Sequence, residues 1–83
     1  MIITIKLFAS LRESLGEAEF LLELEGENDV ASVKEALSSR GHEWREALNQ
    51  PNLVHSVNHK VVFTDTAVSD GDELAFFPPM TGG

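Results

Sequence analysis

The segment that decides the arrangement of this chain is its last eleven residues, Glu73-Leu74-Ala75-Phe76-Phe77-Pro78-Pro79-Met80-Thr81-Gly82-Gly83. Its first five residues predict a strand because apolar side chains alternate between two faces. Leu74 and Phe76 fall on one face, and Ala75 and Phe77 fall on the other. We expect Phe76 to lie in a core and Phe77 to be exposed.

The strand is followed by a narrow tail. Proline has no N–H for the sheet and fixes φ at about −65°, so two consecutive prolines end the strand and favour an extended stem. The two terminal glycines make a tip no wider than the backbone. Four residues beyond Pro79 span at most about 13 Å, enough to carry the terminal carboxylate into a narrow pocket of another protein. The sequence thus predicts a domain over 1–77 and an extended tail over 78–83.

The start of the chain also predicts a strand. Residues 2–8 predict a strand with Ile3, Ile5 and Leu7 on the core face. Phe8 falls on the other face, where it is either an exposed aromatic or closes the edge of the core. If the first and last strands are neighbours in the middle of a sheet, Phe8 and Phe77 lie together on its open face. Contiguous exposed apolar patches mark interaction sites.

One main helix is expected from Val30 to Arg40, with Asp29 as its N-cap and Gly41 just after its end. Asn58 is placed where a turn requires positive φ. Strands around a single main helix predict an α+β fold, in which a mixed sheet packs on that helix. The other expected elements are a turn or short helix over 9–16, a strand over 19–25, a short helix over 42–48, and extended runs over 53–57 and 61–63.

The composition restricts the class of partner. Fourteen acidic and six basic residues give a net charge of −8, which disfavours nucleic acid and anionic membrane surfaces. The charge suits a partner with a basic face, or it serves only solubility. There is no cysteine, so disulfides and thiolate chemistry are excluded, and a cytoplasmic location is expected. The apolar residues at the start of the chain are too few to span a membrane.

The chain lacks the usual catalytic and ligand-binding motifs. Its three histidines are not spaced as metal ligands, and we expect no metal or bound cofactor. The terminal carboxyl, with a pKa of about 3.3–3.7, is ionised and a poor acyl electrophile at neutral pH. Activation to an acyl-adenylate with ATP, followed by sulfide transfer, would convert it to a thiocarboxylate. A Gly-Gly end leaves room for both steps.

Residues 70–83 closely resemble the C-terminal signature of the molybdopterin synthase small subunit family, and residues 7–13 and 57–62 are similar to two further segments of that family. The resemblance implies a ubiquitin-like β-grasp fold and a non-catalytic sulfur carrier. An activating enzyme that consumes ATP would adenylate Gly83, which then becomes a thiocarboxylate. The large subunit would supply the catalytic side chains in a heterotetramer, where sulfur passes to cyclic pyranopterin monophosphate.

The resemblance also implies which residues meet the large subunit. The partner-binding positions are Phe8, Arg12, Val61 and Phe77. The residues that would insert with the tail ahead of Gly83 are Pro78, Pro79, Met80, Thr81 and Gly82. From its sequence context alone, Arg12 is either an anchor for a partner carboxylate or a solvated charge. Residues 41–52 match the family poorly, so no role is carried over to them.

Two other functions remain open at this point. A related carrier could deliver sulfur to thiamine synthesis or to tRNA thiolation. A ubiquitin-like protein modifier would instead join Gly83 to lysines of other proteins.

Overall fold

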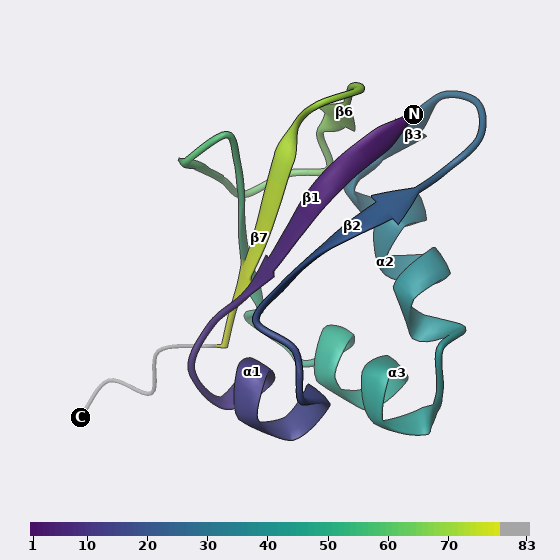
Figure 1. Cartoon of the computed structure of the whole chain (residues 1–83). Helices are drawn as coiled ribbons and strands as arrows, with labels where there is room; N and C mark the ends of the chain where they lie inside the picture. Colours follow the sequence, from purple (N-terminus) through teal and green to yellow (C-terminus); the bar gives the residue numbers. More distant parts are fainter. Residues whose placement is uncertain (79–83) are drawn as a thin grey trace.

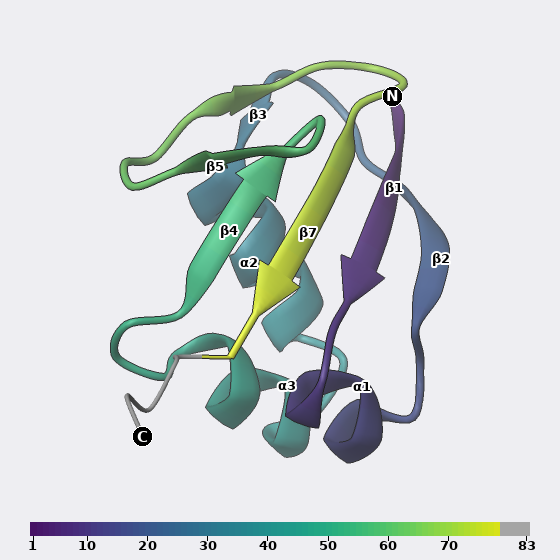
Figure 2. The same ribbon diagram turned by 90° about the vertical axis from the view of Figure 1, so that its left-hand side faces the viewer.

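The fold, seen in a computed structural model that describes residues 1–78, is built around two parallel neighbouring strands. β1 (Ile2–Leu7) pairs with β7 (Glu73–Phe77), and Leu7 lies opposite Phe76. The other strands of this five-stranded sheet are β2 (Glu19–Glu23), β4 (Val54–Val57) and β5 (Lys60–Val62), in the order β2-β1-β7-β4-β5 (Figure 2). The remaining pairings are antiparallel. The prediction that the first and last strands are central neighbours is confirmed.

One face of the sheet is covered by the helix α2 (Val30–Ser38), while α1 (Ser10–Leu15) and α3 (His42–Leu48) lie near the end of the sheet where β1 and β7 finish (Figure 1). The core between them is apolar, as the strand and helix periodicities predict. Its fully buried large side chains are Ile3, Ile5, Leu7, Leu11, Val30, Val33, Leu37, Leu48, Leu74 and Phe76. The α+β architecture with one main helix is therefore confirmed.

The main helix begins as predicted but ends earlier. The Ser32 amide donates to Asp29 Oδ1 over 2.8 Å and the Asp29 amide donates to Ser32 Oγ over 2.9 Å, forming a capping box. The hydrogen bond from the Ser32 amide lowers the pKa of the Asp29 carboxyl below its ordinary value. The helix stops at Ser38 rather than Arg40. Ser39 Oγ donates to the Ala36 carbonyl over 2.6 Å and occupies one of the last carbonyls.

Arg40 leaves the helix because its side chain is held elsewhere. Its guanidinium lies 4.3 Å from the centre of the Phe20 ring and 4.8 Å from that of Trp44. Its Nη1 also lies 3.0 Å from a carboxylate oxygen of Glu17. Phe20 and Glu17 lie in an earlier part of the chain, so local helix signals could not indicate these two contacts, whereas Trp44 is only four residues from Arg40. Trp44 packs at the rim of the core.

A second, two-stranded sheet was not expected from the sequence. β3 (Asn28–Asp29) pairs antiparallel with β6 (Ala67–Val68). The segment before β6 is also tied to the start of α2, because Asp65 Oδ1 accepts a hydrogen bond from the Ala31 amide over 2.9 Å. The Thr66 carbonyl accepts from the Val30 amide over 2.9 Å.

The turn between β4 and β5 confirms the expected positive φ at Asn58 and adds a second. Asn58 has φ of 51° and His59 has φ of 69°. This pair of left-handed residues between paired Val57 and Lys60 is the form of a two-residue hairpin. Asn58 Oδ1 accepts from the Glu73 amide over 2.9 Å, and Asn58 Nδ2 donates to Asp72 Oδ1 over 3.0 Å. The hairpin is thereby fixed to the start of β7.

We predict that His59→Gly stabilises the protein. A non-glycine residue in the left-handed region is strained, and glycine at the second turn position is favoured in such hairpins. The exposed contact between His59 and Glu73 (3.3 Å) that would be lost contributes little. The free energy of unfolding in urea should rise by about 0.5–1 kcal/mol, after the entropy cost of glycine is included. A decrease would show that the contact with Glu73 outweighs the relief of strain.

Candidate functional site

The centre of the candidate site is a stacked pair of phenylalanines on the open face of the sheet. Because Leu7 lies opposite Phe76 in parallel strands, the next residues, Phe8 and Phe77, also lie side by side. Their ring centroids are 4.7 Å apart and their planes differ by 7°. Phe8 is 37% exposed and Phe77 is half-buried. The prediction that both lie on the open face is confirmed, but Phe77 is half-buried rather than exposed, because it is stacked on Phe8.

Val61 lies on the same face. The sheet register places Lys6 beside Ala75, Ala75 beside Ser56, and Ser56 beside Val61, so all four side chains point to one side. Val61 is 46% exposed. Ala75 is buried, although it was placed on the outer face with Phe77. It lies in the centre of the sheet with neighbours on both sides, and its small side chain does not reach beyond them.

Arg12 is not brought onto this face. It lies on α1, which begins two residues after Phe8, and its side chain is exposed. Within residues 1–78 no acidic side chain forms a salt bridge with it. Its solvated state agrees with one of the two alternatives left by the sequence, and the anchor role implied by the family resemblance stays a prediction.

A row of charges crosses the open face beside these apolar side chains. Lys6 Nζ lies 3.3 Å from Glu73 and 3.5 Å from Glu19, and His59 Nε2 lies 3.3 Å from the second oxygen of Glu73. Glu73, by hydrogen bonding first and by its charge second, raises the pKa of Lys6 above its ordinary value. Lys6 is thus a cation at neutral pH, held between two carboxylates. The row separates the phenylalanine pair from the part of the face near the N-terminus.

Sequence reasoning missed the most exposed apolar residue. Phe63 is 87% exposed and follows β5. Alternation from Val61 would have indicated that Phe63 also points outward. Leu21, on the same face of β2 as Glu19 and Glu23, is 70% exposed, and Ile2 is 46% exposed at the start of β1.

The tail begins at the same end of the sheet as the phenylalanine pair. Pro78 is the last described residue, is half-buried and directly follows Phe77. The predicted tail residues Pro79, Met80, Thr81 and Gly82, and the predicted reacting residue Gly83, lie outside the described residues. Their roles are therefore untested predictions.

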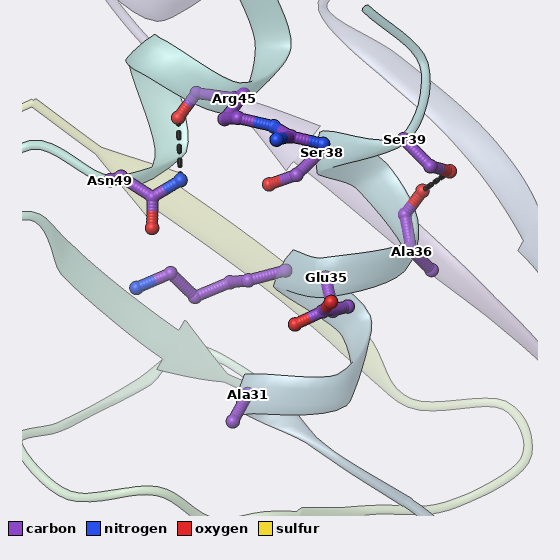
Figure 3. Close-up of a pocket in the computed structure, with 8 residues that line it drawn as sticks. Ala31, Glu35, Ala36, Ser38, Ser39, Arg45 and Asn49 are labelled. Carbon is purple, nitrogen blue, oxygen red and sulfur yellow. Dashed lines mark hydrogen bonds between the residues drawn. The ribbon is translucent and has the colours of Figure 1, made fainter.

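A shallow groove of about 660 Å³ lies between α2 and α3 (Figure 3). Figure 3 shows Arg45 on α3, Asn49 just after its end, and Glu35 on α2 lining it. The side-chain Nδ2 of Asn49 donates to the Arg45 carbonyl over 2.6 Å and caps the last turn of α3. Charges of both signs line the groove, so they select no single class of ligand, and none of the predicted site residues lies there.

The described part of the chain offers little other chemistry. Among residues 1–78, no three His, Asp or Glu side chains are gathered as metal ligands would be. No helix within that range is both long enough and apolar enough to cross a membrane.

Comparison with known proteins places these features in context. Residues 5–83 match the model of the ThiS family. The molybdopterin synthase sulfur carrier subunit of Haemophilus influenzae is 39% identical over 79 residues, covering 92% of this chain and 93% of that protein. A putative molybdopterin converting factor subunit 1 from Pyrococcus furiosus superposes with a TM-score of 0.80 at 26% identity, covering 96% and 99% of the two chains. Small archaeal modifier protein 1 of H. volcanii gives a TM-score of 0.80 at 25% identity, with 95% and 98% covered.

Proposed function

Because the chain belongs to the ThiS family, we propose that it is the small subunit of molybdopterin synthase, a sulfur carrier in the synthesis of the molybdenum cofactor. The observation that carries the proposal is the 39% identity with a sulfur carrier subunit over nearly the full length of both chains. The fold is the ubiquitin-like β-grasp fold expected from the family resemblance.

The chemistry takes place at the C-terminal carboxylate of Gly83. An activating enzyme transfers AMP from ATP to this carboxylate, and pyrophosphate leaves. A sulfur donor then displaces AMP, so that a C–S bond replaces the C–O bond to phosphate and the terminus becomes a thiocarboxylate. No redox change occurs at the glycine carbon. ATP is consumed by the activating enzyme and no cofactor is bound by this chain.

The second partner is the large subunit of the synthase, with two copies of this chain on a large-subunit dimer. The tail, Pro78 to Gly83, enters the large-subunit active site, where sulfur passes to cyclic pyranopterin monophosphate. Phe8, Phe77 and Val61 support this proposal because they are apolar side chains on one open face of the sheet, and Phe77 directly precedes the tail. A partner that covers this face lies next to the start of the tail.

The proposal is tested by the intact mass of the chain after co-expression with its activating enzyme and sulfur donor. Replacement of one terminal oxygen by sulfur raises the mass by about 16 Da. We expect this shift in the whole chain and its loss when ATP is omitted from a reconstituted reaction. No shift in the presence of an activating enzyme that sulfurates a known carrier would contradict the proposal.

The alternative functions differ in the product that the activated C-terminus goes on to form. The similarity to small archaeal modifier protein 1 favours a protein modifier as the second candidate. A modifier would form isopeptide bonds between Gly83 and lysines, which digestion and mass spectrometry detect as glycyl-lysine branches. A carrier for thiamine or tRNA thiolation would form the thiocarboxylate but would not bind the synthase large subunit.

A further inference from the structure

We propose that Phe63 is a specificity anchor for the synthase large subunit, inserting into an apolar pocket beside the surface that receives Phe8, Val61 and Phe77. This inference rests on the proposed function. It adds a residue that the family resemblance did not assign.

Phe63 extends the apolar surface of the open face beyond the phenylalanine pair. Val54 lies opposite Phe77, and Phe77 is stacked on Phe8, so these three side chains form one apolar row across β4, β7 and the end of β1. The row lies at the end of the sheet from which the tail leaves. Phe63 is the first residue after β5, two residues along from Val61, so strand alternation places it on the same open face.

The backbone around Phe63 is held in place although its side chain is 87% exposed. Val62 pairs with β4 on one side of it. On the other side, the Thr64 carbonyl lies 3.1 Å from His55 Nε2, and Asp65 Oδ1 accepts from the Ala31 amide over 2.9 Å. An aromatic side chain on a fixed backbone loses little conformational freedom when a partner encloses it, which is typical of interface anchors.

The large subunit fits this position better than a second copy of the chain does. A partner that covers Phe77 and Val61 on the open face also lies close to Phe63, which is two residues along from Val61. Self-association through this face would bring together two chains of net charge −8, and like charges disfavour such contact. Aromatic side chains are enriched in the buried centres of protein interfaces. Phe63 takes no part in this chain's own core, so its side chain is free for such a contact.

The test compares Phe63→Ser with Leu21→Ser, using purified large subunit as the probe. Leu21 is also a highly exposed apolar residue (70%) on the open face, but it lies on β2 beyond the row of charges. We expect both variants to keep the melting temperature of the parent. Phe63→Ser should raise the dissociation constant for the large subunit by at least about tenfold, as loss of an aromatic anchor does. Leu21→Ser should change it by less than about twofold.

The outcomes separate this inference from the proposed function. If the parent chain binds the large subunit and Phe63→Ser binds equally well, the inference is overturned and the function stands. If Leu21→Ser weakens binding as much as Phe63→Ser, the effect is general surface hydrophobicity and the inference is also overturned. If the parent chain does not bind the large subunit at all, the proposed function and the inference about Phe63 are both wrong. Self-association of the parent that disappears in Phe63→Ser would assign the row to a second copy instead.

Discussion

Deletion of Gly82 and Gly83 should abolish thiocarboxylate formation and molybdopterin synthesis while the domain remains folded. The proposed chemistry gives the chain one reacting group, the terminal carboxylate, and a chain ending at Thr81 presents that group two residues short and beside a branched side chain. The described core lies between Ile3 and Phe76, and the last strand ends at Phe77. The deletion therefore removes the reacting group without removing a strand or a core residue.

Three measurements check this result: the intact mass after activation, the melting curve, and product formation in a reconstituted synthase. We expect no mass increase, an unchanged melting temperature, and product below detection. A second variant with one alanine added after Gly83 should behave in the same way, because its carboxylate is displaced in the opposite direction. A truncated chain that still supports product formation would assign the function to the folded domain as a non-covalent binding module.

The topology brings the phenylalanine pair and the start of the tail to the same end of the sheet. β1 and β7 are parallel, so the residue after each strand emerges at the same end of the sheet. Phe8 and Pro78 are therefore brought to the same end of two central strands, although they come from opposite ends of the chain. An antiparallel pairing of these strands would have placed Phe8 at the far end from the tail. The parallel pairing makes the apolar surface and the root of the tail one continuous feature for a partner to bind.

Features set by neighbouring residues could be predicted from the sequence. The alternation in β1 and β7 assigned the faces of Ile3, Ile5 and Phe76, because strand periodicity alone decides them. Asp29 was found as the N-cap and Asn58 as a left-handed turn residue for the same reason, since both signals are local. The adjacency of Phe8 and Phe77 needed one further assumption, that the first and last strands are central neighbours.

Features set by distant contacts could not be predicted. β3 and β6 are each two residues long, too short to show any periodicity. Arg40, two residues past the end of α2, contacts Phe20 and Glu17 from an earlier part of the chain. Alternation places Phe63 on the same face as Val61, but it does not show that the rest of the chain leaves this side chain uncovered. Its 87% exposure depends on the packing of the whole fold.

We expect substitutions at the two adjacent phenylalanines of β7 to have different effects: at Phe76 mainly on stability, and at Phe77 mainly on binding of the large subunit. Phe76 is fully buried in the middle of the core, and Phe77 is half-buried against Phe8. Phe76→Ala should lower the free energy of unfolding by about 3–5 kcal/mol because it leaves a large cavity. This is a large part of the stability of a domain of this size. Phe77→Ala should cost only about 1 kcal/mol, chiefly the lost stacking.

Binding should show the opposite order. Phe77→Ala removes a half-buried aromatic ring from the apolar row and should raise the dissociation constant for the large subunit by about thirtyfold. Phe76→Leu, which keeps the core filled well enough to fold, should leave that constant within about twofold of the parent. Urea denaturation and titration calorimetry on the same preparations give both quantities. A folded Phe76→Leu protein that binds as weakly as Phe77→Ala would show that the surface depends on core packing beneath it, and the assignment of separate roles to the two faces of β7 would be wrong.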